Sequence, residues 1–306
     1  VAEAVTATMS GNHQTGIEFD SPSGSADTNS QVNDNNFSVS LSETTDGGMT
    51  ISSSFSIVNE GATSGNIGTS DMDAGFSLAF TDGSKLDVLN AGNASGSHDI
   101  SVPGSAGAET VTTATTNSAE TGLDFMTGAS VQGIEYHSAA DFLADGLKMS
   151  FSASTDSGAA ALPTYRIDSH VAVGATYVTD LGDSAVTIGA GWSEVGGSKT
   201  STAPTNDTGG FHVGLSAVTG DLTVAVGFAD GNKVGTGVKG AKEVTADVVK
   251  AGIKYVSGDL TFNVGIASGD STDNTIGSIS GSGDAKDVTS ASVSYAVASG
   301  VTAILG

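Results

Sequence analysis

The amino-acid sequence predicts an all-β protein built as one up-and-down antiparallel barrel, and three observations lead to that prediction. Short turn signals divide the chain into hairpins. The segments between the turns alternate small polar with apolar residues, and the connections are short at one end of these segments and long at the other. A period of two is the pattern of a strand whose two faces differ, and a Gly-containing turn between two such segments indicates a hairpin.

The predicted turns are two to four residues long and recur along the whole chain. They are Asp46-Gly47-Gly48, Asp82-Gly83, Asp145-Gly146, Gly182-Asp183, Gly220-Asp221, Gly258-Asp259 and Ser299-Gly300. Two of them lie within near-copies of one phrase, AVTGDLTVAVGF at 217–228 and YVSGDLTFNVGI at 255–266. A turn flanked on both sides by alternating segments is the strongest short-range signal of a hairpin.

The strand count follows from these turns. One strand precedes the first long connection and each of the seven turns joins two strands, which predicts fifteen strands, the last beginning at Val301. One of them has to lie within 120–140, where Gly122, Gly128 and Gly133 interrupt the alternation, and without it the count fails. Closed sheets of this kind have an even number of strands. We therefore expect a single barrel domain over residues 1–306 with sixteen strands, the last of them missing from this chain.

The two faces of the predicted strands separate a barrel from a soluble sandwich. Phe37, Val39 and Leu41 share one parity while serines take the other, and the stretch 147–152 repeats this pattern. The polar face carries mostly Ser, Thr, Gly and Asn, which suit a crowded aqueous interior better than open solvent. The segments run about 8–12 residues, close to the about 9–11 of a tilted membrane-spanning strand. We therefore expect a transmembrane barrel with a polar lumen and an apolar outside.

The connections opposite the turns are long and rich in Gly, Ser and Asp. They are predicted at residues 20–35, 59–70, 90–128, 155–168, 195–209, 230–246 and 268–287. Short turns at one rim and long loops at the other are typical of outer-membrane barrels.

Composition restricts the classes of function. The chain has 306 residues, with 43 Gly, no Cys and 38% apolar residues, below the about 45–50% of an ordinary packed protein. Its net charge of −24 excludes nucleic-acid binding, which needs a basic surface. No stretch approaches the about 20 apolar residues of a membrane-spanning helix. No signal peptide is visible at Val1, so an exported protein would already have lost its leader.

Two segments of the chain resemble a known family. The segment FSVSLSETTDGGMTISSSF at 37–55 resembles the second and third strands of sixteen-stranded general porins, particularly those of alphaproteobacteria. The segment FSLAFTDGSKLDVLN at 76–90 resembles the next hairpin of that family, which leads into the third loop. The resemblance covers nearly the whole chain. It implies a general diffusion porin of Gram-negative outer membranes, a non-enzymatic, water-filled channel for small hydrophilic solutes and ions. It also implies a homotrimer surrounded by outer-membrane lipid and lipopolysaccharide.

The resemblance also gives a role to the third long connection, 90–128. In such porins the third loop is the longest and folds into the barrel, where it narrows the pore. The third connection is the longest here too, and it carries acidic residues without any Lys or Arg. The residues expected at the constriction are Asp99, Glu109, Glu120 and Asp124.

The basic residues that this family sets against the third loop are few in this chain. Those expected on the lumen wall are Lys148, Arg166, Lys250 and Lys254. A surplus of carboxylates creates a negative potential that raises the local concentration of cations. We therefore expect a cation-preferring channel.

The chain also offers other candidate sites and fits a second class of protein. The five histidines, which lack metal-ligand spacing and favour structural or lumen-lining roles over a zinc site, are His13, His98, His137, His170 and His212. Acidic loop runs offer Ca²⁺ ligands at Asp27, Asp34, Asp270 and Asp273, with a solvated loop as the other interpretation. No convergent set of titratable residues indicates catalysis, so no enzyme and no cofactor other than Ca²⁺ is expected. The rival class is a secreted or surface-layer acidic β protein with a structural or adhesive role.

Overall fold

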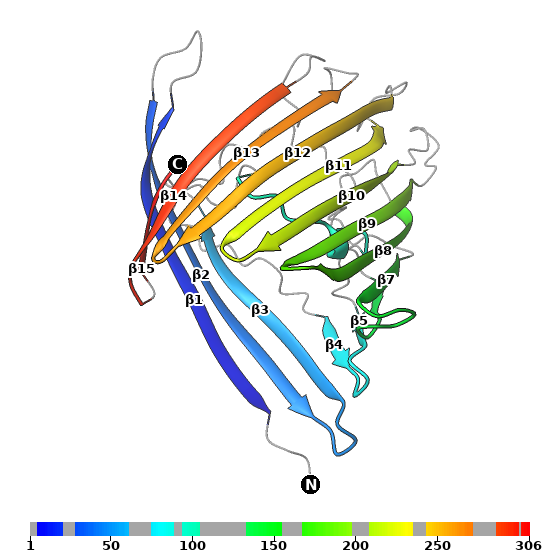
Figure 1. Ribbon diagram of the computed structural model, residues 1–306. Coiled ribbons are helices and arrows are strands. Elements are labelled where there is room, and N and C mark those ends of the chain that lie inside the picture. The colour runs from blue at the N-terminus through cyan, green and yellow to red at the C-terminus, as the bar shows by residue number, and fades with distance from the viewer. Residues whose placement is uncertain are drawn as a thin grey trace, which may run out of the picture.

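A computed structural model gives the fold of the chain. It describes residues 5–20, 28–60, 75–88, 94–104, 133–154, 167–197, 208–234, 243–271, 286–299 and 301–306. In these residues fifteen strands form one antiparallel sheet, in which every strand is hydrogen-bonded to its neighbours in sequence, from β1 to β15 (Figure 1). This is the up-and-down order that the succession of hairpins predicts.

The strands differ widely in length. Their bounds are β1 Thr6–Asp20, β2 Thr28–Thr44, β3 Thr50–Glu60, β4 Phe76–Ala79, β5 Lys85–Val88, β6 Ile134–His137, β7 Leu147–Ser154, β8 Ile167–Leu181, β9 Ser184–Gly197, β10 Thr208–Thr219, β11 Leu222–Val234, β12 Glu243–Ser257, β13 Leu260–Ser271, β14 Lys286–Ala298 and β15 Val301–Leu305. A short 3₁₀ turn, η1 Gly96–His98, follows β5. No helix in the described ranges is long and apolar enough to cross a bilayer.

The predicted strand count is confirmed, including its weakest member. The doubtful region 120–140 supplies β6, a strand of four residues that pairs with β5 on one side and β7 on the other. The last strand begins at Val301, as expected. Strand lengths depart from the predicted 8–12 residues in both directions, since β1 has 15 and β2 has 17, whereas β4, β5 and β6 have 4 each. The first long connection, expected at 20–35, is therefore reduced to 21–27.

All seven turn signals lie between consecutive strands, but three connections are longer than the predicted two to four residues: 45–49 and 80–84 span five residues each, and the one between β6 and β7 is longer still. The connection between β6 and β7 spans nine residues, 138–146. Asp141 adopts a positive φ of 61°, and its side chain accepts a hydrogen bond of 2.6 Å from the backbone N–H of Gly146. The Gly146 carbonyl in turn accepts a hydrogen bond from the N–H of Val178 on β8, at 2.9 Å. The connection is thus an ordered loop whose last residue is hydrogen-bonded to the neighbouring strand.

Along the strands the apolar side chains are exposed and the polar side chains are buried, the reverse of a water-soluble protein. On β13, Val264 is 52% exposed whereas its neighbour Asn263 is 1% exposed. Serines on the inner face, such as Ser152 and Ser193, are buried as well. Apolar side chains on the outside and packed polar side chains inside are the arrangement of a membrane barrel, and the face assignment made from the alternation is confirmed.

Aromatic side chains on the outer face gather towards the two ends of the strands. Tyr177, Tyr255 and Tyr295 are exposed close to the turns. Trp192 and Phe211 are exposed towards the long connections, where Trp192 pairs with Phe211 across β9 and β10. Aromatic rings at two levels are the pattern of the two membrane–water interfaces.

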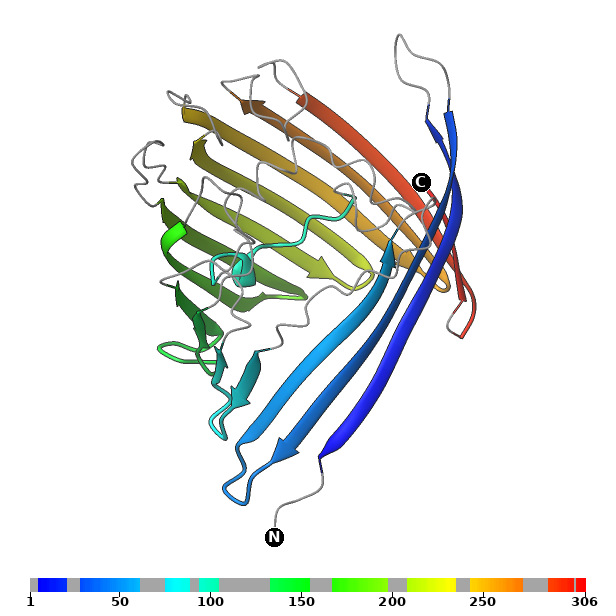
Figure 2. The same cartoon turned by 180° about the vertical axis from the view of Figure 1, so that it is seen from behind.

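The sheet curves strongly, and its first and last strands come back towards each other in both views (Figures 1 and 2). Among the described residues no ladder joins them, because β1 pairs with β2 and β15 with β14. A sixteenth strand between them remains a prediction. The concave face of this curved sheet carries the site described below.

The outer face generates the first testable prediction. Replacing Val264, in the middle of β13, by Lys should lower the free energy of unfolding from lipid vesicles by about 2–4 kcal/mol, because a charge at the bilayer midplane loses its hydration. The matched variant Val297→Lys, on the same face beside the turn that follows β14, should cost only about 0–1 kcal/mol. Denaturant titration of the two variants measures this difference, and equal costs at both depths would contradict an outward lipid-facing surface.

Candidate functional site

A segment of the third long connection lies inside the curved sheet. Residues 94–104, with η1 among them, run across the inner face of β7 to β13 (Figure 2). They belong to the predicted loop 90–128, and this part of it is folded into the interior as expected. The remainder of that loop lies outside the described residues, so its role in narrowing a pore remains a prediction.

Glycines on the inner face make room for this segment. One after another, strands β8 to β13 present to it Gly174, Gly189, Gly191, Gly214, Gly227, Gly252 and Gly265. A Cβ on Gly252 would overlap the carbonyl oxygen of Pro103, and one on Gly265 would overlap the backbone of Gly104. Glycine in a strand often marks a place where another backbone approaches closely, and here it allows the segment to lie directly on the wall.

Hydrogen bonds from two strands fix the start of the segment. The backbone N–H of Ala94 donates to Ser152 Oγ on β7, at 3.1 Å. His212 Nε2 on β10 donates to the carbonyl oxygen of Ser95, at 2.8 Å. The other ring nitrogen, His212 Nδ1, has no hydrogen-bond partner within the described ranges and lies 3.7 Å from Asp99 Oδ1. A wall histidine is thus enclosed by the segment, with its free nitrogen turned towards a carboxylate.

His98 is the side chain of the segment that is bound most extensively to the wall. Its Nδ1 lies 2.6 Å from Thr176 Oγ1 and its Nε2 lies 2.8 Å from Ser150 Oγ. Burial, together with the nearby charges of His137, His212 and Lys148, lowers the pKa of His98 to about 4. The imidazole is therefore neutral at pH 7, when one of its nitrogens donates and the other accepts.

Apolar contacts hold the far half of the segment. Ile100 and Val102 form a small buried cluster with Ala225 of β11. Because the described inner face is otherwise mostly polar or glycine, these two side chains are the apolar attachment of the segment to the wall.

The structure brings together two of the predicted site residues. Asp99 on the segment is 39% exposed on its side chain, and it lines a cavity of about 240 Å³ together with Lys250 of β12. Lys148 lines a second, larger recess of about 570 Å³ near the β6–β7 connection. Lys254 lies on the inner face of β12, half-buried and closer to the turn.

The other predicted site residues are not brought together. Outside the described residues lie Glu109, Glu120, Asp124, Arg166, Asp27 and Asp273. Asp34 and Asp270 are strand residues of β2 and β13, opposite Gln14 and Asp247 respectively. Nothing in the described part of the chain supports Ca²⁺ at these positions.

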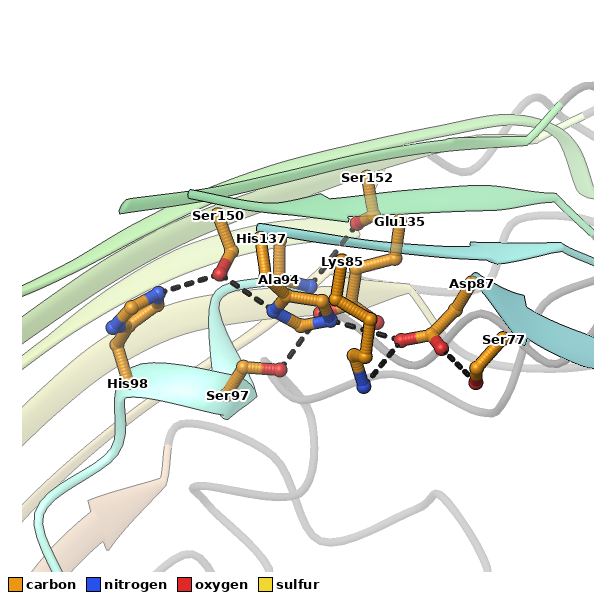
Figure 3. A network of polar contacts seen from close by, with 10 residues as sticks. All are labelled: Ser77, Lys85, Asp87, Ala94, Ser97, His98, Glu135, His137, Ser150 and Ser152. Carbon is orange, nitrogen blue, oxygen red and sulfur yellow. Dashed lines mark hydrogen bonds and ion pairs between the residues drawn. The ribbon is translucent and has the colours of Figure 1, made fainter. Parts of the chain in front are cut away.

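A polar cluster that the sequence interpretation did not find lies on the inner wall where the segment begins (Figure 3). Asp87 Oδ2 accepts from Lys85 Nζ at 2.8 Å and lies 2.9 Å from His137 Nε2. Glu135 Oε1 lies 3.6 Å from the same nitrogen and accepts a 2.7 Å hydrogen bond from Ser97 Oγ of the segment. Glu135, Asp87 and His137 could together hold a metal ion, because one ligand atom from each lies within 4.8 Å of the others.

The signal for this cluster is short and local. Glu135 and His137 are two residues apart and therefore share one face of a strand. Asp87 and Lys85 have the same spacing on the strand before the third connection. The up-and-down order predicts that β5 and β6 are neighbours, but the sequence does not disclose their register, because 45 residues, 89–133, separate them.

The chain is similar in sequence or fold to porins and other outer membrane proteins. A family model described as Gram-negative porin matches residues 1–306. Among solved structures, OmpF of Salmonella typhi in complex with daunomycin superposes with a TM-score of 0.62 at 15% identity, over 94% of this chain and 85% of that one. A loop-deletion mutant of OmpT, an outer membrane protein of Vibrio cholerae, gives 0.60 at 14% identity, with 97% and 90% covered. A mutant porin of Rh. blastica gives 0.59 at 15% identity, with 98% and 93% covered. No curated protein sequence matches the chain.

The glycine contacts generate a second prediction. Gly252→Ala places a methyl group where the Pro103 carbonyl lies, so docking of residues 94–104 should weaken by about 1–3 kcal/mol. Gly227→Ala is the matched control, because its Cβ would meet Val102 Cγ2 at an ordinary 3.6 Å. Hydrogen exchange of the amides of 94–104 in detergent measures both. Equal protection in the two variants would show that the segment does not rest on the glycines.

The lowered pKa of His98 generates a third prediction. An unfolded histidine binds a proton near pH 6.5 whereas folded His98 does so only near pH 4, so acidification between these values favours the undocked state. The contribution is complete above about pH 6.5 and is lost progressively as the pH falls towards 4. The thermal midpoint of the unaltered protein should fall between pH 7 and pH 5 more steeply than that of His98→Gln. Identical slopes would contradict the assignment of this pH dependence to His98.

Proposed function

Since the chain belongs to the family of Gram-negative porins, which are channels of the outer membrane without catalytic activity, we propose that it passes small hydrophilic solutes and ions by diffusion, with a preference for cations. The family assignment gives no support to the rival class, a secreted or surface-layer acidic protein.

The proposal of a diffusion channel rests on how residues 94–104 lie against the inner wall. The wall is polar on its inner face, with buried Ser, Asn and His side chains. The segment is tied to that face by hydrogen bonds to Ser152, Thr176 and Ser150, which leaves its acidic Asp99 beside a cavity. A water-filled passage lined by hydroxyls and narrowed by a fixed loop selects solutes by size and charge.

The proposed cation preference rests on charge. The chain has 34 Asp plus Glu against 10 Lys plus Arg, and the constriction we propose consists of Asp99 with Glu109, Glu120 and Asp124. The described wall also carries Lys148, Lys250 and Lys254, so the acidic residues must outweigh these at the narrowest point. One structural neighbour is described as an anion-selective porin from Comamonas acidovorans, which indicates that the fold alone does not determine the sign of the preferred ion.

We extend the proposal to assembly and surroundings. A homotrimer is proposed because a neighbour of the same fold, OmpT of Vibrio cholerae, is described in a trimer form. The exposed apolar outer face is suited both to lipid and to a neighbouring barrel. Lipopolysaccharide is proposed as the lipid that faces the long connections, and export with removal of a leader is proposed as the route to the membrane.

The reversal potential of the channel in a KCl gradient across a planar bilayer tests the ion preference. The unaltered protein should prefer K⁺, Asp99→Asn should reduce that preference, and Lys250→Met should increase it, because each substitution changes one charge beside the same cavity. Asp183→Asn, an exposed turn residue, is the control and should leave the reversal potential unchanged. A preference for Cl⁻ in the unaltered protein would contradict the proposal, and so would an equal effect of Asp183→Asn and Asp99→Asn.

A further inference from the structure

Four charged or titratable side chains form a square on the inner wall, at the level where the third connection begins. Lys85 lies opposite His137 across β5 and β6, and Asp87 lies opposite Glu135 two residues further along the same two strands. All four residues share the inward face, because their neighbours Ile134 and Tyr136 are exposed on the outer face. Two carboxylates directly opposite each other repel and normally destabilise a strand pair, so this arrangement requires a compensating positive charge.

The two carboxylates are also withdrawn from water. The side chain of Glu135 is 3% exposed and that of Asp87 is 8% exposed. Within the described residues Lys85 is the single Lys or Arg in contact with either carboxylate. Two buried negative charges against one ammonium leave one negative charge uncompensated when His137 is neutral. Buried charges are paired or coordinate metals.

The geometry of the possible ligand atoms suits a small divalent cation. His137 Nε2 lies 2.9 Å from Asp87 Oδ2 and 3.6 Å from Glu135 Oε1. Ligands at the 2.0–2.2 Å typical of nitrogen and oxygen around tetrahedral zinc are separated by about 3.3–3.6 Å. The two distances from His137 therefore differ from this spacing by no more than about 0.4 Å, and the three ligand atoms all lie within 4.8 Å of one another.

Each of the three side chains is hydrogen-bonded to a serine, which binds Asp87 and His137 on the atom away from the proposed ion and Glu135 on the same oxygen that faces it (Figure 3). Ser77 on β4 donates to Asp87 Oδ1, and Ser97 on the inner segment donates to Glu135 Oε1 at 2.7 Å. Ser150 on β7 lies 2.8 Å from His137 Nδ1, the nitrogen turned away from the carboxylates. Outer contacts of this kind fix the orientation of metal ligands and the tautomer of a ligating histidine.

Access comes from the larger recess near the β6–β7 connection. Lys85 and His137 both line it, and its volume is about 570 Å³. Lys85 is 43% exposed on its side chain, so its ammonium group can leave Asp87 and move into the recess on its flexible stem.

We propose that Asp87, Glu135 and His137 form a binding site for a first-row divalent cation such as Zn²⁺ on the inner wall, and that Lys85 occupies the place of this cation in its absence. Ligands of one imidazole and two carboxylates suit zinc and its neighbours in the first transition row better than Ca²⁺. Binding replaces one positive charge by two and so balances the buried carboxylates. The site goes beyond the proposed diffusion function and does not depend on the ion preference of the channel.

Isothermal titration of the full chain in detergent with zinc chloride tests this site. The unaltered protein should show saturable binding of one Zn²⁺ per chain. Glu135→Gln and His137→Gln should each abolish or severely weaken it, because each removes a ligand. Ser77→Ala, which leaves all three ligands in place, should lower the affinity about 10–100-fold.

Lys85 provides a test in the opposite direction. Lys85→Met keeps the length of the side chain and removes the competing charge, so Zn²⁺ affinity should rise roughly tenfold or more. The matched control is Lys254→Met, which removes another lysine of the inner face and should leave the Zn²⁺ affinity within twofold. A merely structural role for the cluster would give no gain in affinity from Lys85→Met.

A spectroscopic measurement distinguishes loss of the metal site from failure of a variant to fold. Co²⁺ added to the unaltered protein should give visible absorption bands of a nitrogen- and oxygen-ligated site, and these should be lost in His137→Gln but kept in Asp145→Asn, an exposed carboxylate in the adjoining connection. Absence of saturable Zn²⁺ binding to the unaltered chain would overturn the proposal. Binding that Glu135→Gln and His137→Gln leave unchanged would overturn it as well. Neither readout involves conductance, so a channel without cation preference would leave the site standing.

Discussion

The close approach of residues 94–104 to the inner wall is the contact on which the interior of this protein depends. A chain segment inside a barrel can be fixed only if its backbone reaches hydrogen-bonding and packing partners on the wall, and side chains on the wall normally prevent this. Here six neighbouring strands, β8 to β13, supply glycine at the positions under the segment. Loss of stabilising side-chain contacts within these strands is thus offset by direct contact between the wall and the segment, including that of Pro103 with Gly252.

The hydrogen bonds of the segment and the polar cluster on the wall form one network. Ser150 Oγ lies 2.8 Å from both His98 Nε2 and His137 Nδ1, so a histidine of the segment and a histidine of the cluster share one hydroxyl. Ser97 of the segment donates to Glu135. A hydroxyl has one proton to donate and two lone pairs that accept, so it can hydrogen-bond to both imidazoles at once. The docked segment therefore shares Ser150 with His137 and contacts Glu135 of the wall cluster directly.

Much of the fold follows from local patterns that act within one or two hairpins. The alternation at 37–41 and 147–152 assigned the outer and inner faces correctly, because the period of side-chain direction in a strand is fixed. The Gly-containing turns located all seven hairpin ends. The nine-residue connection 138–146 was predicted too short, since only its last residues, Asp145-Gly146, carry a turn signal. The remainder is ordered by hydrogen bonds that no turn signal marks, from the N–H of Gly146 to Asp141 Oδ1 and from the N–H of Phe142 to the carbonyl of Leu147.

The residues of the candidate site likewise fall into those that the sequence identifies and those that only the structure brings together. Asp99 and Lys250 could be selected by sequence type and position, and the structure places them on one cavity. The cluster around Glu135 could not, because the register that sets Asp87 opposite Glu135 and Lys85 opposite His137 is not fixed by any short turn between β5 and β6.

The sequence by itself determined the all-β class, the succession of hairpins, the polar inside and the apolar outside, because these depend on turn chemistry and on the period of the strand. Tertiary structure alone decided which glycines lie beneath residues 94–104, which histidines hold that segment, and which two carboxylates face each other in the wall. Those features depend on strand register across the sheet and on the path of a connection through its interior. Both are set by contacts between residues far apart in the chain.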